Sequence, residues 1–224
     1  MVDMNKLLGQ FLGSGAASGF AGGLAGGLAS NMLTTKSGRK MGKNVLKVGG
    51  VAAVGALAYT AYQRYSNTQG ATPVSSSDEV VSAVTPAPSG SAFMPEESNQ
   101  AANEALGLIL VRAMIAVARA DGRLDAQESQ AIFQRIETLG LDSESQALLV
   151  QEMGHPVDVD AIVNSANGSP ETAAEIYIAS LLAVEVDTAA EKAYLSMLAA
   201  RLQLPPELVM ELERQVEAQK IFAQ

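Results

Sequence analysis

The sequence predicts an all-α fold, with a helical bundle of about 120 residues that follows a glycine-rich N-terminal region and a linker. Two observations support this. Of the 224 residues 48% are hydrophobic but only 4% are aromatic, so the apolar content is mostly Ala, Leu, Val and Ile. From about residue 100 the apolar residues also recur at helical spacing, and no strand-like alternation is sustained. The composition and the period both favour helix packing on helix.

Charge divides the chain into three regions. Residues 1–65 carry seven Lys or Arg and one acid, residues 66–99 carry four acids and no base, and residues 100–224 carry eight bases and nineteen acids. A basic, glycine-rich region and an acidic, helix-patterned region rarely share a core. We therefore expect a membrane-anchoring region at 1–65, a flexible linker at 66–99 and a helical domain at 100–224.

Residues 7–35 contain no charged residue, and glycine recurs there at every fourth position, at Gly15, Gly19, Gly23 and Gly27. On a helix these glycines form one flat stripe. In water each glycine costs about 1 kcal/mol relative to Ala, whereas in lipid the stripe lets two helices approach closely. The pattern predicts a membrane-associated helix that self-associates through these glycines. A flexible tail is the alternative interpretation.

A second apolar stretch covers residues 45–65, where only Lys47 and Arg64 are charged. Its uncharged interior is slightly shorter than the roughly 20 residues that span a bilayer, but the flanking cations can reach the head groups. Five basic residues between 36 and 47 suit anionic lipids and, by the positive-inside rule, place the C-terminal domain in the periplasm, beyond the bacterial inner membrane. A buried helix at 45–62 is the alternative.

The predicted linker, residues 66–99, contains eight Ser, four Pro and no sustained hydrophobic period. Such a segment cannot bury enough apolar surface to offset the entropy of ordering it. The composition therefore predicts disorder.

Seven helices are predicted beyond the linker, at about 100–121, 125–140, 143–154, 158–166, 169–184, 188–202 and from 205 onward. Their starts carry capping signals. Ser169 precedes Pro170, and Thr188 precedes Glu191 at the spacing of a capping box.

A shift of 63 residues superposes the two halves of this domain. Asp125 falls on Thr188 and Glu128 on Glu191, and the apolar positions that follow these caps also coincide. The sequence therefore predicts two pseudo-repeated halves.

Two segments carry a resemblance to a known family. The segment "AMIAVARADGRLDAQESQAI" (113–132) resembles the tellurite-resistance TerB-like helical domain. The segment "AAEIYIASLLAVEVDTAAEKAYLSMLAARLQLPPELV" (173–209) is similar to the C-terminal half of a bacterial inner-membrane family of unknown function built on that domain. The resemblance implies a seven-helix TerB-like bundle, a membrane anchor and a link to envelope or metal stress, but no established activity.

The resemblance also implies a divalent-cation site at the first helix turn, where Asp121, Asp125 and Glu128 match acids proposed as ligands in TerB-like domains. At the second turn only Glu185 and Asp187 could contribute, because the Asp-Gly pair is missing there. Capping explains Asp125 and Glu128 without any ligand. Asp121 is the acid that such structural roles explain least.

Several function classes are excluded or disfavoured. The chain has no Cys and a single His, His155, which we interpret as a polar loop residue. No P-loop pattern is present, the acidic body would repel nucleic acid, and Tyr177 and Ser180 are expected to pack a helix interface.

These exclusions favour a non-enzymatic envelope protein without a cofactor, which binds membrane lipids and either an unidentified protein partner or a divalent cation. The alternative is a metal-dependent hydrolytic enzyme that uses Asp121, Glu185 and Asp187 around a divalent ion.

Overall fold

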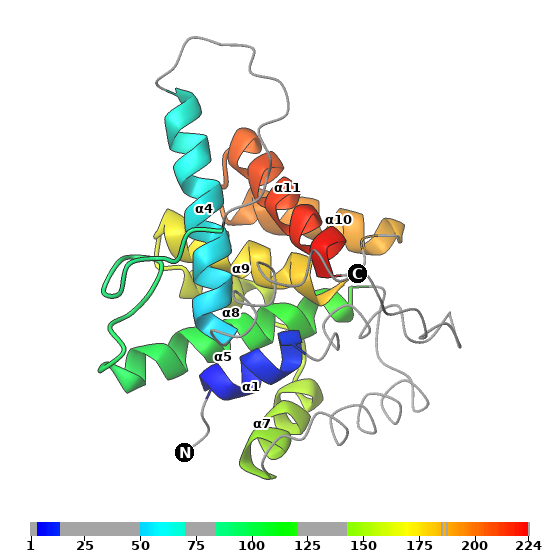
Figure 1. The fold of residues 1–224 in the computed structure, drawn as a ribbon. Coiled ribbons are helices and arrows are strands. Elements are labelled where there is room, and N and C mark those ends of the chain that lie inside the picture. The colour runs from blue at the N-terminus through cyan, green and yellow to red at the C-terminus, as the bar shows by residue number, and fades with distance from the viewer. Residues whose placement is uncertain are drawn as a thin grey trace.

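The computed structural model describes residues 4–13, 50–69, 84–120, 143–184, 186 and 188–223. Within these residues every named element is a helix, and the extended backbone pairs only in one isolated bridge, between Ser91 and Met94. The predicted all-α class is confirmed for this part of the chain. The helices are α1 (Met4–Gly13), α4 (Gly50–Gln69), α5 (Gln100–Ala118), α7 (Ser143–Gly154), α8 (Val159–Ser165), α9 (Pro170–Ala183), α10 (Ala189–Arg201) and α11 (Pro206–Ala223) (Figure 1).

Two helices, α5 and α9, pack side by side through the middle of the molecule (Figure 1). α4 crosses this pair and contacts α9, and α11 packs on both α4 and α9. α1 lies against α4 and α5, whereas α7 and α8 pack on α5. One hydrophobic core joins these elements, and its most buried large side chains include Leu110, Ile176, Leu198 and Leu212.

Helix starts follow the predicted caps. The Ser169 side chain accepts the Thr172 N–H before Pro170 opens α9, and Thr188 and Glu191 form a complete capping box at the start of α10. Each cap satisfies N–H groups that lack a partner within the helix. The 63-residue repeat stays a prediction, because 125–142 lie outside the described residues.

The N-terminal region shares its core with the rest of the chain, contrary to the prediction of separate cores. Met4, Leu7 and Leu8 of α1 are buried in the same cluster as the side chains of α5 and α9. The approach of α1 to α5 is close, because a Cβ added at Gly107 would lie 2.6 Å from the Cβ of Met4. Segregated charge did not prevent joint burial, because these α1 side chains are apolar.

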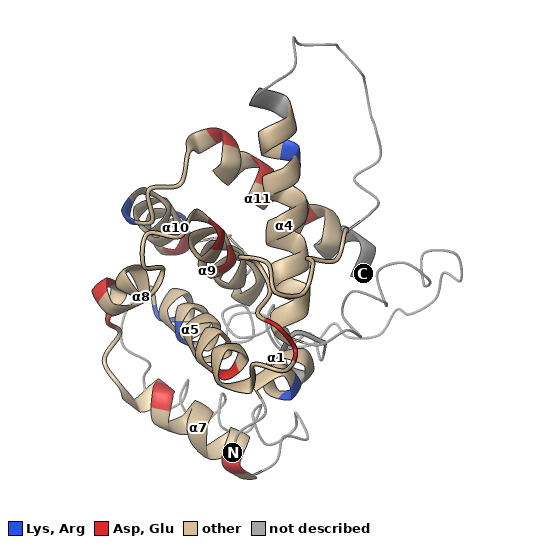
Figure 2. Ribbon diagram, turned by 90° about the vertical axis from the view of Figure 1, so that its left-hand side faces the viewer, with Lys and Arg blue, Asp and Glu red and all other residues tan. Residues whose placement is uncertain are grey.

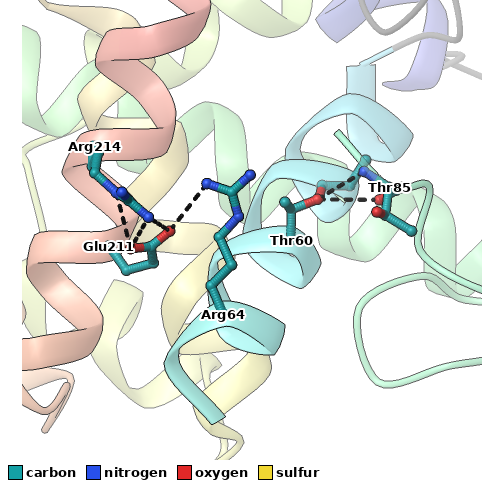
Figure 3. A network of polar contacts seen from close by, with 6 residues as sticks. Thr60, Arg64, Thr85, Glu211 and Arg214 are labelled. Atoms are coloured by element: carbon teal, nitrogen blue, oxygen red, sulfur yellow. Dashed lines mark hydrogen bonds and ion pairs between the residues drawn. The ribbon is translucent and has the colours of Figure 1, made fainter. Parts of the chain in front are cut away.

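The second apolar stretch, predicted as a membrane segment, contributes α4 to this core. Val51, Val54 and Leu57 are buried, and Figure 3 shows α4 tied to α11 where Glu211 pairs with both Arg64 and Arg214. The alternative interpretation, a buried helix, therefore describes α4. Among the described residues the helix long and apolar enough to cross a membrane is α5, half of which is buried, and core helices share that property.

The prediction of a disordered linker is wrong for residues 84–99. Phe93 is 6% exposed and packs edge-on against Tyr59 and Tyr62 of α4. The Thr60 hydroxyl accepts the Thr85 N–H at 2.9 Å, which fixes the start of this segment on α4 (Figure 3). A single aromatic anchor and this hydrogen bond give the segment the buried contacts that its composition did not suggest.

Candidate functional site

One side of α5 combines apolar and basic residues. Ile109, Arg112, Ala116 and Arg119 follow one another at intervals of three or four, so they share one face of the helix. In Figure 2 the basic positions of α5 are seen on the side that faces α8. This face meets α7, α8 and the loop between them.

Arg112 and Glu152 join α5 to α7 through a two-pronged ion pair. The Arg112 Nε donates to Glu152 Oε2 at 2.7 Å, and Nη2 donates to Oε1 at 2.9 Å. Glu152 is 8% exposed, and the hydrogen bonds from Arg112 hold its pKa below the ordinary 4.5 against the opposing effect of burial. Such a bidentate pair is among the stronger and more directional polar contacts in proteins. Glu152 is therefore an ionised group whose charge is already matched.

Arg119 holds the end of α7. Its Nη1 donates to the carbonyl oxygens of Met153 at 3.2 Å and His155 at 2.8 Å, which are among the carbonyls that a helix end leaves unpaired. Its Nε is buried and has no hydrogen-bond partner among the described residues. Arg119 thus has a donor that the helix packing does not use.

A pocket of about 250 Å³ lies between α5, α7 and α8. We call it the arginine pocket, and its lining comprises Ile109, Arg112, Ile115, Ala116, Arg119, Glu152, His155, Pro156, Val157, Asp158, Ala161, Ile162 and Ser165. Asp158 is the N-cap of α8 and accepts the Ala161 N–H at 2.8 Å. His155, predicted as a polar loop residue, lies in the loop at this pocket and is exposed. The arginine pocket combines apolar walls with two cations, and both features suit ligand recognition.

A second carboxylate lies in the core, and none of the ion pairs within the described ranges involves it. Glu175 of α9 is 0% exposed, and neither of its carboxyl oxygens has a hydrogen-bond partner in the described part of the chain. A Cβ added at Gly55 of α4 would contact the Phe93 carbonyl and lie 3.2 Å from Glu175 Oε1. Burial, reinforced by the charge of Glu171, raises the pKa of Glu175 well above 4.5. Burial therefore favours the neutral form of the Glu175 carboxyl.

The predicted packing residues behave as expected. The buried Tyr177 donates its hydroxyl to Glu213 of α11 at 2.8 Å, and burial is the first cause that raises its pKa above 10. Ser180 is 0% exposed and donates to the Ile176 carbonyl within α9. Both hydroxyls are buried and are held by groups of the packed helices, which fits a structural role.

The predicted cation ligands, Asp121, Asp125, Glu128, Glu185 and Asp187, all lie outside the described residues. The same holds for the glycine stripe of Gly15, Gly19, Gly23 and Gly27. Over the ranges that are described, no three His, Asp or Glu side chains are grouped as a metal site would require. The cation site and the stripe therefore stay predictions.

Sequence reasoning missed the residues of the arginine pocket. Arg112 and Arg119 are two of only eight basic residues in an acidic body, and they stand seven residues apart, which is nearly two helical turns. That spacing could have indicated a basic face. Nothing local, however, indicates that Glu152, forty residues away, pairs with Arg112.

The described helices define an all-helical protein with a small charged pocket at the edge of its core. The chain belongs to a family of unknown function, DUF533, whose members match it over residues 18–216. It is also similar to a Yersinia enterocolitica protein described as "Uncharacterized protein in ampR 5'region", at 25% identity over 111 residues. That match covers half of this chain and 79% of the relative. No solved structure matches the chain.

Proposed function

We propose that this chain is a membrane-anchored, non-enzymatic envelope protein whose helical body binds a protein partner through the arginine pocket. The observation that carries the proposal is that polar side chains of the pocket already form hydrogen bonds with other groups of the protein. Arg112 is held by Glu152, and Asp158 caps α8. These groups fix the walls of an open pocket instead of converging on one reacting atom, which favours binding over catalysis.

The proposed anchor is the N-terminal sequence. Residues 14–35, which follow α1, are uncharged, and the five basic residues between 36 and 47 suit anionic lipid head groups. The resemblance to TerB-like domains supports a seven-helix body and a role in envelope or metal stress. The predicted periplasmic body required residues 45–65 to cross the bilayer, but α4 is packed in the same core as α1. The basic residues 36–47 therefore adjoin the body without a crossing between them, and the positive-inside rule favours the cytoplasmic face. A C-terminal alkaline phosphatase fusion tests the orientation: we expect an inactive fusion, and an active one contradicts it.

A photo-crosslinking amino acid tests partner binding in the membrane. Ala161 lines the arginine pocket and is exposed, so a crosslinker there reaches the pocket without disturbing the core. Ala200, exposed on α10, is the matched control. We expect a discrete protein adduct from position 161 that is missing from position 200. Equal adducts, or none, at both positions contradict partner binding at the pocket.

Cation binding through Asp121, Asp125, Glu128, Glu185 and Asp187 is proposed on the resemblance. Calorimetric titration with Ca²⁺, Mg²⁺ and Zn²⁺ tests it. The full chain is the proper sample, because α1 and α4 complete the core on which α5 and α9 pack. Heat of binding and a raised melting temperature are expected, and neither should appear if the acids serve only as helix caps.

A further inference from the structure

One nitrogen of the Arg119 guanidinium, Nε, forms no hydrogen bond among the described residues. Arg112 binds the Glu152 carboxylate through its Nε and Nη2 atoms, the side-on edge of a guanidinium. In Arg119 the Nη1 atom is taken by two backbone carbonyls, while Nε is buried and has no acceptor in the described part of the chain. Because the guanidinium is rigid, turning the Nε edge toward the pocket exchanges the Nη1 contacts for contacts to the ligand, but it gives up no hydrogen bond at Nε. Arg119 is prepared to bind an anion in the way that Arg112 binds Glu152.

The charge of the arginine pocket favours a single negative charge. The Arg112 cation is matched by Glu152, and Asp158 places a further carboxylate at the rim. Arg119 is left as the one cation of this lining that no carboxylate pairs with among the described residues. A dianion such as phosphate would meet two neighbouring carboxylates, whereas a monoanion needs only one guanidinium edge.

The remaining walls are apolar. Ile109 and Ile115 of α5 and Ile162 of α8 are among the residues that line a volume of about 250 Å³. That volume lies just below the roughly 300–1,000 Å³ of most ligand sites, so it holds a short apolar group and not a nucleotide.

We propose that the arginine pocket binds a carboxylate that carries a short apolar group, with Arg119 holding the carboxylate. This inference rests on the proposed binding function and names its ligand chemistry. A polypeptide C-terminus with an apolar last residue and a small free carboxylic acid both have that chemistry.

Four probes test the ligand class on the full chain in detergent micelles: N-acetyl-Ala-Leu, its C-terminal amide, 4-methylpentanoate and inorganic phosphate. Because His155 is the single histidine of the chain and lies at the pocket, its ring-proton NMR signal reports binding without further assignment. We expect the peptide acid to bind at least tenfold more tightly than its amide, since only the acid carries the anion. Equal binding of the acid and the amide overturns the proposal, and so does tighter binding of inorganic phosphate.

Substitutions test whether Arg119 causes the preference for the acid over the amide. Arg119→Gln should make the acid and the amide bind alike, a ratio that a merely structural role would not change, while the exposed control Arg201→Gln keeps the preference. Unchanged acid preference in Arg119→Gln overturns the assignment. Tighter binding of the peptide than of 4-methylpentanoate supports a polypeptide C-terminus as the source, and equal binding supports a small acid.

The two proposals can fail separately. Adducts at position 161 without any binding of the acids leave a partner site with a different ligand chemistry. Binding of the acids without adducts leaves the ligand class standing and removes the protein partner.

Discussion

Two buried glutamates show how position decides the state of one side chain. Glu152, at the edge of the bundle, accepts hydrogen bonds from Nε and Nη2 of Arg112, and its pKa is lowered. Glu175, in the middle of α9, faces Gly55 and Phe93 without a hydrogen-bond partner in the described structure, and its pKa is raised. Pairing with Arg112 favours the ionised form of Glu152 at the pocket, whereas burial favours the neutral form of Glu175 inside the core.

This difference separates stability from recognition. A charged pair at the edge retains access to solvent and to a ligand, so its desolvation cost is limited. An unpaired carboxyl in the core lowers stability, because the group loses its hydration without a replacement. We therefore expect ligand binding at the pocket beside Glu152, and a pH-dependent loss of unfolding free energy caused by Glu175.

The largest expected effect is the pH dependence that Glu175 gives to unfolding. Its folded pKa lies above the unfolded value of about 4.5, so its contribution to stability is fully present below pH 4.5 and is lost as pH rises toward the folded pKa. The free energy of unfolding should fall by about 1.4 kcal/mol per pH unit in that window. Glu175→Gln should remove this slope in urea unfolding measured from pH 5 to pH 8.

The matched control for this series is Glu207→Gln, at the exposed start of α11. It should leave the slope of the native chain unchanged. If Glu175→Gln keeps the native slope as well, Glu175 is ionised in the folded chain and the comparison between the two glutamates fails.

A glycine near each glutamate tests the packing around it. Gly55→Ala would push a Cβ against the Phe93 carbonyl, whereas Gly154→Ala, at the end of α7, meets no atom within 4 Å. We expect Gly55→Ala to lower the free energy of unfolding by about 2 kcal/mol, since backbone must move to accommodate it. Gly154→Ala should be neutral or stabilising by up to about 1 kcal/mol, from helix propensity. Similar melting temperatures for the two variants would mean that the segment around Phe93 yields freely.

Local signals predicted the helix boundaries better than the packing. The caps at Ser169 and Thr188 are determined by neighbours in the sequence, and the structure has both. The burial of α4 depends on contacts with α9 and α11, far along the chain, and a glycine- and alanine-rich helix suits a membrane or a close-packed core equally well. Composition therefore could not decide between those two environments.

The candidate site shows the same limit. Arg112 and Arg119 share a face by spacing alone, which a sequence can show. The Arg112–Glu152 pair joins residues forty positions apart. The carbonyl groups that Arg119 binds come within its reach only when the fold places the end of α7 beside α5. Non-local contacts of this kind are set by the tertiary arrangement, so the pocket could not be predicted from local pattern.

A smaller effect is expected from Glu152→Gln. Removing one partner of the ion pair should lower the free energy of unfolding by about 1 to 2 kcal/mol, less than for a fully buried pair, because the Arg112 side chain is 48% exposed. The folded pKa of Glu152 is lowered, so this contribution is present above the unfolded pKa and is lost as pH falls through the folded value. Thermal unfolding at pH 7 and at pH 2 should show a difference from the native chain only at pH 7.

The smallest effect is expected for the surface pair between Arg201 of α10 and Asp160 of α8, whose side chains are 40% and 71% exposed. Solvent screens this pair and the long arginine side chain keeps its freedom, so Asp160→Asn should change the free energy of unfolding by about 0.5 kcal/mol or less. Salt at about 0.5 M should remove even that difference, because the Debye length at that ionic strength is roughly 4 Å and the two exposed charges are then largely screened. Chemical unfolding with urea, with and without salt, measures both. The contradicting result is a loss of unfolding free energy for Asp160→Asn that resists salt and is as large as that of Glu152→Gln. The exposed Arg201–Asp160 pair would then stabilise the chain as much as the Arg112–Glu152 pair that joins α5 to α7.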